Sequence, residues 1–233
     1  MPRRLNLPDS ASVAQPGDNG RLFAPSAARN SQAICDALCQ IAPPSGRALE
    51  LASGTGQHVV SLARAMPALS WQPTEIDAAR RTSIDAHAAD AALSNVAPAV
   101  ALDATAPGWG GQHPGQDLIF LSNLLHLVSE TEARCVIQEA ALALAPGGLL
   151  AIYGPFMRDD ALTSDGDAAF HASLQAQDPE IGYKSDFDVV DWGAAARLEF
   201  AGMIEMPANN LLICWRKPGQ GQGPNPVAQS QLT

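Results

Sequence analysis

The chain has 233 residues, of which 46% are hydrophobic and 16% charged, and its formal net charge is −10. This length and composition fit one soluble globular domain, and no apolar run approaches the about 20 residues of a membrane span. The negative charge argues against a sequence-independent grip on nucleic acid, because phosphate binding needs clustered Lys and Arg. No apolar core follows the arginines near the start, so we expect a cytoplasmic protein without membrane or nucleic-acid partners.

Both ends of the chain lack the periodicity of helices and strands. Residues 1–20 are rich in Pro, Ser, Asn and Asp, and residues 218–233 are rich in Gly, Gln and Pro. We expect both to be disordered tails around a single domain over residues 21–217, because they bury little apolar surface. The cysteines form no Cys-x-x-Cys pair and lack zinc-type histidine spacing, which favours buried thiols and predicts no metal site. They are Cys35, Cys39, Cys135 and Cys214.

Helix and strand patterns alternate through the first half of the chain. Asp77 follows the second strand and can cap the next helix through its side-chain oxygen. The predicted elements, in order, are a helix over residues 26–41, a strand over 48–52, a helix over 57–65, a strand over 71–76, a helix from 78 to about 92 and a short strand over 99–102.

The second half continues this alternation and ends in a hairpin. Ser129 and Glu132 have capping-box spacing, which predicts a helix behind them that ends at residues 146–148. The other predicted elements are strands over residues 117–122, 149–153, 203–206 and 211–216 and a helix around 168–177. Only four residues join the last two strands, which permits an antiparallel pair but no right-handed crossover. We therefore predict an α/β fold with a doubly wound, mostly parallel seven-stranded sheet, an antiparallel last strand and helices on both faces.

A loop with two glycines, Gly54 and Gly56, joins the first strand to its helix. This geometry points backbone N–H groups and the positive end of the helix dipole at a ligand beyond the strand, which suits a nucleotide-like cofactor. Glu75 lies 19 positions after Gly56, the separation at which an acid ending the second strand reaches ribose hydroxyls. A solvated glutamate at a strand end is the alternative interpretation.

Several motifs together resemble a known class of enzymes. The order Glu50-x-Ala52-x-Gly54-x-Gly56, Glu75, Asp103 and Pro146-Gly147-Gly148 is similar to the class I, Rossmann-like S-adenosylmethionine-dependent methyltransferases. More narrowly, the chain resembles a family of small methyltransferase-like proteins classed as a domain of unknown function. The motifs that carry this second resemblance are Ala28-x-Asn30, Ala52-Ser53-Gly54-Thr55-Gly56-Gln57-His58, Trp71-Gln72-Pro73, Tyr153-Gly154-Pro155-Phe156 and Met206-Pro207-Ala208-Asn209-Asn210.

The resemblance implies S-adenosylmethionine as the cofactor, although the class usually has glycine where this chain has Ala52. Arg29 either pairs with the methionine carboxylate or is solvated, and Glu50 is expected to orient the loop rather than touch the ligand. Asp103 is expected to accept a hydrogen bond from the adenine amino group, with a loop cap as the alternative. The implied cofactor-binding residues are Arg29, Glu50, Ala52, Ser53, Gly54, Gly56, Glu75, Asp103 and Asn123.

Candidates for the chemistry lie at the carboxyl ends of the predicted strands. His126 is the candidate general base, with a structural histidine at a helix start as the alternative. Tyr153, the second catalytic candidate, and Phe156 are expected to line the substrate pocket or to pack the domain. Asn209 and Asn210 serve the turn or contact substrate, Asn30 is a further substrate candidate, and we interpret His58 as a surface residue.

Together these features predict an S-adenosylmethionine-dependent methyltransferase that acts on a small molecule by in-line methyl transfer. The alternative is a non-catalytic protein that binds the cofactor on the same fold and has a regulatory or partner-binding role. We expect a monomer or a homodimer. Residues 158–191, between the fifth and sixth predicted strands, are expected to cover the pocket.

Overall fold

In a computed structural model, which describes residues 14–219, one central sheet organises the chain. Its strand order is β4-β3-β5-β6-β8-β7. The strands are β3 (Gly46–Leu51), β4 (Leu69–Pro73), β5 (Gln116–Ser122), β6 (Leu144–Pro155), β7 (Glu199–Met206) and β8 (Asn210–Arg216). The first four of these strands in chain order are mutually parallel, and β8 runs antiparallel to both β6 and β7. The predicted fold class and the reversed last strand are confirmed.

The seventh strand position, next to β4, is filled irregularly. Val96 and Val100 form isolated parallel bridges with Trp71 and Thr74, and no continuous strand covers the predicted residues 99–102. Pro98 lies between the two bridges and has no N–H to donate, so a regular ladder is interrupted there. The sheet of the described residues therefore has six continuous strands and an irregular edge.

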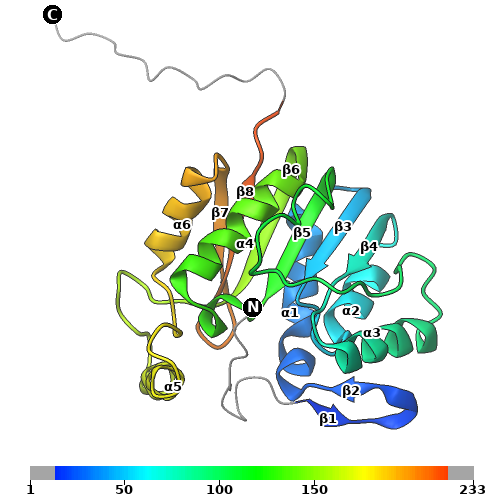
Figure 1. Ribbon diagram of the computed structural model, residues 1–233, viewed down its shortest axis with the longest axis horizontal. Helices are drawn as coiled ribbons and strands as arrows, with labels where there is room; N and C mark the ends of the chain where they lie inside the picture. The colour runs from blue at the N-terminus through cyan, green and yellow to red at the C-terminus, as the bar shows by residue number, and fades with distance from the viewer. Residues whose placement is uncertain (1–13, 220–233) are drawn as a thin grey trace, which may run out of the picture.

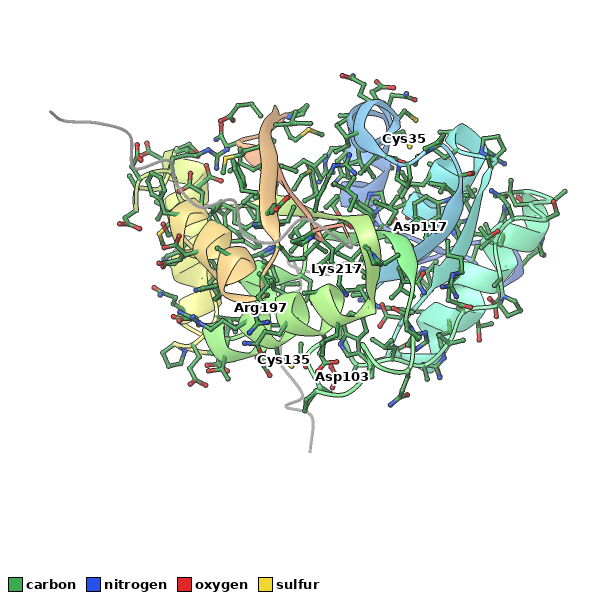
Figure 2. The ribbon with its side chains drawn as sticks, turned by 90° about the horizontal axis from the view of Figure 1, so that it is seen from above. Cys35, Asp103, Asp117, Cys135, Arg197 and Lys217 are labelled. Carbon is green, nitrogen blue, oxygen red and sulfur yellow. The ribbon has the colours of Figure 1, made fainter. Side chains whose placement is uncertain are left out.

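Helices cover both faces of the sheet (Figure 1). One face carries α1 (Pro25–Ile41), α2 (Gln57–Ala65) and α3 (Ala78–Asp90), and the other carries α4 (Glu130–Ala143) and α6 (Asp186–Ala195). Successive strand residues point to opposite faces, so Ala48 packs with the first group and Leu49 with the second. Figure 2 shows the same division, with Cys35 on one side of the sheet and Cys135 on the other.

Local sequence signals explain where two helices begin. The side chain of Asp77 accepts a hydrogen bond from the Arg80 N–H at 2.9 Å, as predicted for the cap of α3. Ser129 and Glu132 form the predicted capping box at the start of α4. The helix α5 (Asp165–Gln175) overlaps the one predicted around residues 168–177 but begins earlier, whereas α6 has no counterpart in the prediction.

A small hairpin precedes α1 and shortens the predicted amino-terminal tail. β1 (Gln15–Pro16) pairs with β2 (Leu22–Phe23), and the Leu22 N–H donates to Ser83 Oγ of α3 at 2.8 Å. The Leu22 carbonyl also bonds His87, so α3 holds the hairpin by backbone contacts that the composition of residues 1–20 did not reveal. The rest of both predicted tails, residues 1–13 and 220–233, lies outside the described residues. Within residues 14–219, no helix combines the length and apolar character needed to cross a membrane.

Candidate functional site

The glycine loop turns sharply because several of its residues have left-handed backbone. Ala52, Gly54 and Gly56 have φ angles of 50°, 58° and 95°. A Cβ on Gly56 would lie 2.7 Å from the Ile84 Cα, so this glycine lets the loop pack on α3. A Cβ on Gly54 would meet only the Arg80 Nη1, at 4.0 Å, so this position faces open space. Ala52 holds the strained left-handed conformation despite its Cβ, at the position where the methyltransferase class usually has glycine.

Glu75 is held against this loop at the carboxyl end of β4. Its carboxylate accepts hydrogen bonds from the Gly54 N–H at 3.0 Å and from the Asp77 N–H at 3.2 Å. The side chain is buried, so the alternative of a solvated glutamate is wrong. A carboxylate has about four lone-pair sites, and these two bonds leave room for further donors. Glu75 is therefore placed where the spacing predicted it, beside the backbone of the loop.

Glu50 lies fully inside the protein at the carboxyl end of β3. Neither oxygen of its carboxyl group has a hydrogen-bond partner among the described residues, and burial raises its pKa to about 8. Its backbone carbonyl accepts from Ser53 Oγ at 3.3 Å and from Thr74 Oγ1 at 2.9 Å. Ser53 therefore anchors the loop, and the Glu50 carboxyl is neutral at pH 7.

Asp103 lies on the α4 side of the sheet, next to Cys135 (Figure 2). Its Oδ1 accepts hydrogen bonds from the Thr105 N–H at 2.9 Å and from Thr105 Oγ1 at 2.6 Å. This is the loop cap that the sequence left open as an alternative. Because both bonds use Oδ1, the second oxygen keeps its lone pairs.

Arg29 is exposed near the start of α1, and no residue within 14–219 forms an ion pair with it. The helix itself is fastened to the glycine loop. Gln57 Oε1 accepts from the Ala24 N–H at 2.6 Å and from Thr55 Oγ1 at 2.9 Å. The start of α2 and the residue that precedes α1 therefore lie side by side, and Arg29 is exposed, as its alternative interpretation as a solvated residue allows.

Asn123 closes the carboxyl end of β5. It has left-handed backbone, with φ of 55°, and its N–H donates to the Tyr153 carbonyl at 2.9 Å. Asparagine tolerates this conformation better than most residues. The residue therefore joins the ends of β5 and β6 at the edge of the sheet where the glycine loop also lies.

His58 and Asn30 form part of a polar network. His58 Nε2 lies 2.7 Å from Asn30 Oδ1, and its Nδ1 lies 3.1 Å from Ser122 Oγ. Burial raises the pKa of Tyr153, and the side chain of Asn30 reduces this effect. His58 is only 7% exposed, so the interpretation as a surface residue is wrong. The fold brings together residues from three of the quoted motifs that are far apart in the sequence.

Tyr153 and Phe156 point to opposite faces of the sheet. Tyr153 packs with the residues under α1 and α2, whereas Phe156 lies in the core under α4 and α6 at 2% exposure. The cause is the alternation of side chains along β6, in which Ile152 shares the α4 face. The expectation that both aromatic residues line one pocket is therefore wrong, and Phe156 is a core residue.

His126 is buried beneath the segment that joins β6 to β7. It lies on a short 3₁₀ turn, η2 (Leu125–Leu127), and its ring is 5.8 Å from Phe170 of α5 and 6.1 Å from Tyr183. Burial, with a smaller effect of the nearby Lys184, lowers the His126 pKa to about 3. The imidazole is therefore neutral at pH 7 but has a low affinity for a proton, which makes it a weak base in this environment.

The amides of Asn209 and Asn210 form hydrogen bonds within the protein, although Asn209 is exposed and Asn210 partly exposed. Asn210 Nδ2 donates to the carbonyls of Pro207 and Ala208, and the β7–β8 turn has left-handed backbone at Ala208 and Asn209. Asn209 Nδ2 donates to Asp167 Oδ2 of α5 at 2.9 Å. Asn210 therefore stabilises the turn and Asn209 fastens α5 to it, while substrate contact by these amides stays a prediction.

Asp167 is the centre of that attachment. Its carboxylate also accepts from Thr163 Oγ1 and Ser164 Oγ, both at 2.7 Å, and from the Tyr183 hydroxyl at 3.0 Å. These hydrogen bonds lower the pKa of Asp167 although burial alone would raise it. No sequence pattern predicted this cluster, because its members come from separate parts of the 158–191 segment and from the β7–β8 hairpin. Among the described residues, no group of three or more His, Cys, Asp or Glu could hold a metal ion.

Comparisons with known proteins agree with this architecture. The family model described as "Protein of unknown function (DUF938)" matches residues 21–217. Among solved structures, an O-methyltransferase family protein from Burkholderia thailandensis is similar over 82% of this chain, with a TM-score of 0.70 and 20% identity. A putative O-methyltransferase from Nostoc punctiforme is similar over 85%, with a TM-score of 0.73 and 18% identity.

Human N-acetylserotonin methyltransferase, solved in complex with S-adenosylmethionine, is similar over 83% of this chain, with a TM-score of 0.67 and 14% identity. The chain spans 57%, 58% and 53% of the lengths of these three proteins. At such identities the similarity shows the fold, which is that of the S-adenosylmethionine-dependent methyltransferases.

Proposed function

Because the chain belongs to the family described as protein of unknown function (DUF938) and has the methyltransferase fold, we propose that it transfers a methyl group from S-adenosylmethionine to a small molecule. The observation that supports this best is the attachment of the buried Glu75 carboxylate to the backbone of the glycine loop. When bound, the cofactor supplies an activated methyl group on a sulfonium, so the protein has to bind, orient and exclude water.

The residues around the loop suit the parts of this cofactor. The free lone pairs of Glu75 accept hydrogen bonds from the ribose hydroxyls, and the open face of Gly54 lets the backbone approach the ligand closely. Ile76 follows Glu75 and is 54% exposed, which offers an apolar surface for the adenine ring. Asp103 Oδ2 accepts from the adenine amino group, and Arg29 pairs with the methionine carboxylate.

The substrate is proposed to be a small molecule because a net charge of −10 opposes binding to nucleic acid. The chain is proposed to act as a monomer or a homodimer. His126 is our candidate for a general base. Because burial lowers its pKa, it suits a substrate that loses its proton readily. The turnover measurement below separates an enzyme from a protein that only binds the cofactor.

Isothermal titration with S-adenosylmethionine tests the proposal. The Glu75→Ala variant leaves the ribose hydroxyls without an acceptor, so its Kd should rise by roughly ten- to a hundredfold, or about 1.5–3 kcal/mol. The matched control is Asp77→Asn, which removes one negative charge two residues away but keeps a good helix cap. Its Kd should stay within about twofold of the wild-type value, since Asp77 caps α3 rather than contacting ribose.

Two results would contradict the proposal. The first is that the wild-type protein binds no S-adenosylmethionine, or binds NAD instead, which would favour a dehydrogenase. Alternatively, it would bind the cofactor but transfer no labelled methyl group to any component of a broad small-molecule screen. The second result would favour the non-catalytic, regulatory alternative on the same fold.

A further inference from the structure

A cavity lies where the sheet lacks a covering helix. Residues 101–115 connect the irregular edge to β5 without forming a helix, and Trp109 of this loop packs into the core cluster under α4. In a doubly wound sheet such a connection normally carries a helix that covers the face. The loop covers less, and a cavity of about 450 Å³ remains between residues 112–116 and residues 94–97. This volume is in the range of small-molecule binding sites.

This cavity is separate from the glycine loop. Arg47, Ser70 and Gln116 line it, and each is the first or second residue of its strand. The glycine loop instead follows Leu51, the last residue of β3, so about 13 Å of strand lies between Arg47 and the start of that loop. A ligand in this cavity is therefore not the cofactor of the candidate site.

Gln116 has an unpaired oxygen at this cavity. The residue is only 7% exposed, and its Nε2 donates to the His113 carbonyl at 3.0 Å. No described residue donates to its Oε1, yet this oxygen is not sealed inside the protein as Trp71 Nε1 is. It is therefore open to the cavity that Gln116 lines. Buried polar atoms in proteins normally have a hydrogen-bond partner, so this oxygen is suited to accept from a ligand.

Two further amide side chains line the cavity and are held in the same manner. Gln72 Nε2 donates to the Pro98 carbonyl at 2.9 Å, and Asn95 Nδ2 donates to the Ala63 carbonyl at 3.0 Å. A carbonyl only accepts, so these bonds fix which end of each amide is the nitrogen. No described residue donates to either amide oxygen. With Gln116, the cavity wall therefore carries three neutral acceptors.

Arg47 supplies a positive charge to the same wall. Its Nη2 donates to the carbonyls of Pro114 and Gly115 at 3.0 and 2.6 Å, which fixes the guanidinium at the end of the loop. The nearby Asp117 carboxylate accepts from the Arg47 backbone N–H at 2.8 Å, and no ion pair joins the guanidinium to a carboxylate within residues 14–219. Its Nε and Nη1 protons are therefore available to an anion.

We propose that this cavity binds a small organic anion that carries hydroxyl groups, such as a hydroxy acid or a sugar phosphate. Arg47 binds the anionic group, since carboxylate and phosphate both match the fork of a guanidinium. The amide oxygens of Gln116, Gln72 and Asn95 accept from the hydroxyl groups. None of the described residues that line the cavity is Asp or Glu, so a ligand with an ammonium group would find no counter-charge there.

Matched small molecules test the need for charge and for hydroxyl groups in the wild-type protein. In isothermal titration, gluconate or glucose 6-phosphate should bind with a Kd of about 1 mM or lower, and the tighter of the two tells whether the site takes a carboxylate or a phosphate. Hexanoate has the charge alone and glucose the hydroxyl groups alone, so both should bind at least tenfold more weakly. The proposal is overturned if neither anion binds at about 10 mM, or if hexanoate binds as well as gluconate.

Variants locate the bound anion. Arg47→Gln removes the charge but keeps an amide donor for the loop carbonyls, and it should raise the Kd of the tighter anion at least tenfold. Gln72→Met removes an acceptor at similar length and should raise this Kd at least threefold. The control Arg197→Gln makes the same charge change beside β7, at the other end of the sheet, and should stay within about twofold of the wild type.

Unchanged affinity in Arg47→Gln, or an equal loss in Arg197→Gln, would overturn the proposal. Thermal melts show whether each variant is folded, and Gln72→Met decides in the same way if Arg47→Gln is not. These titrations contain no S-adenosylmethionine, so the proposed methyl transfer and the anion site can fail independently of each other.

Discussion

The glycine loop shows how one residue type serves two different purposes within three positions. Gly54 and Gly56 both have left-handed backbone, but a methyl group on Gly56 would collide with Ile84, whereas one on Gly54 would project into open space. The clash at Gly56 is with α3, the helix that supports the loop. Gly54 is the position at which a bound ligand would approach the backbone. Their substitutions should therefore be distinguishable by experiment.

The matched variants Gly54→Ala and Gly56→Ala should have opposite profiles. Gly56→Ala combines overpacking with backbone strain and should lower the free energy of unfolding by about 3 kcal/mol. Gly54→Ala should cost only about 1 kcal/mol of stability but should raise the Kd for S-adenosylmethionine at least tenfold, because its methyl group occupies ligand space. Urea unfolding and isothermal titration measure the two quantities. Wild-type affinity in Gly54→Ala would contradict the assignment of the open face.

For single residues, the sequence predicts a position well when it follows from spacing along the chain. It predicts a position poorly when the side-chain partners are far apart in the sequence. The spacing from Gly56 placed Glu75 correctly beside the loop. The sequence reasoning did not predict the face of the sheet to which Phe156 points. That face follows only when the alternation along β6 is counted from a known core residue. His58 was missed because its partners, Asn30 and Ser122, are 28 and 64 residues away.

At the scale of elements, the α5 region of the segment between β6 and β7 is fastened to the rest of the domain mainly through polar contacts, whereas α6 packs into the core through Val189 and Trp192. Asp167 links α5 to Asn209 in the β7–β8 turn, and Arg158 Nη2 donates to the carbonyl oxygens of Asn209 and Asn210 at 3.2 and 3.3 Å. The apolar contribution is small, because the core cluster beneath α5 is formed by Leu127, Leu174 and Ile181 with Phe170 packed against it. Local opening of α5 should therefore depend strongly on Asp167.

Hydrogen exchange measures that dependence. In Asp167→Asn, the donors from Thr163, Ser164 and Tyr183 face an amide instead of a carboxylate, so the amides of α5 should exchange at least tenfold faster. The exchange of β3 and β5 should stay unchanged. Asp165→Asn is the control, because this exposed residue lies in the same first turn and carries the same charge. Equal effects of both variants would mean that helix charge, not the cluster, holds α5.

The accuracy of the predicted elements follows from how local their signals are. The helix α4 was predicted from a capping box that involves four consecutive residues. α6 was missed because its sequence, Asp186–Ala195, contains a glycine and has three aspartates among its first six residues, which resembles a loop. The edge next to β4 was predicted as a strand because its apolar residues were counted without weighing Pro98.

For the molecule as a whole, buried ionisable groups set how stability varies with pH. Burial lowers the pKa of His58 to about 4 and that of His126 to about 3, and it raises the pKa of Glu50 to about 8. Between pH 4.5 and 6.5 the unfolded chain binds more protons at His58, His126 and His171 than the folded protein does, and this outweighs the one proton that only the folded Glu50 keeps. Stability therefore rises with pH. Above pH 6.5, the Glu50 proton is the main difference between the two states, and stability falls as pH rises toward 8.

We therefore expect maximal stability near pH 6.5, with a decline of at most about 1.4 kcal/mol per pH unit between pH 6.5 and 7.5. Lys184, whose pKa burial lowers to about 8, offsets this decline only close to pH 8. Urea unfolding at a series of pH values measures the profile. Glu50→Gln cannot ionise and should remove the decline above pH 6.5, whatever its effect on absolute stability. A decline that persists in this variant would assign it to another group.

The fold class was predictable because it depends on the order of elements, which periodicity and short links reveal over long stretches. The paired core clusters on the two faces of the sheet follow from the same alternation. Only those site residues that lie at strand ends, such as Glu75, could be predicted from the sequence. Its side-chain networks depend on which helices meet above the sheet, and this information is carried by contacts among residues that are far apart along the chain.

The reversal of β8 also determines how the molecule can be attached to a surface. Because β8 runs against β6, its last residues lie at the amino ends of the parallel strands, where Lys217 pairs with the backbone of Gly147 and Gly148. Figure 1 shows α5 and the β1–β2 hairpin at the opposite edge, toward which the β3 arrow points. Immobilisation on the carboxyl-terminal side of Lys217 therefore leaves the candidate site facing away from a sensor chip, which makes that side the better point of attachment for ligand screens.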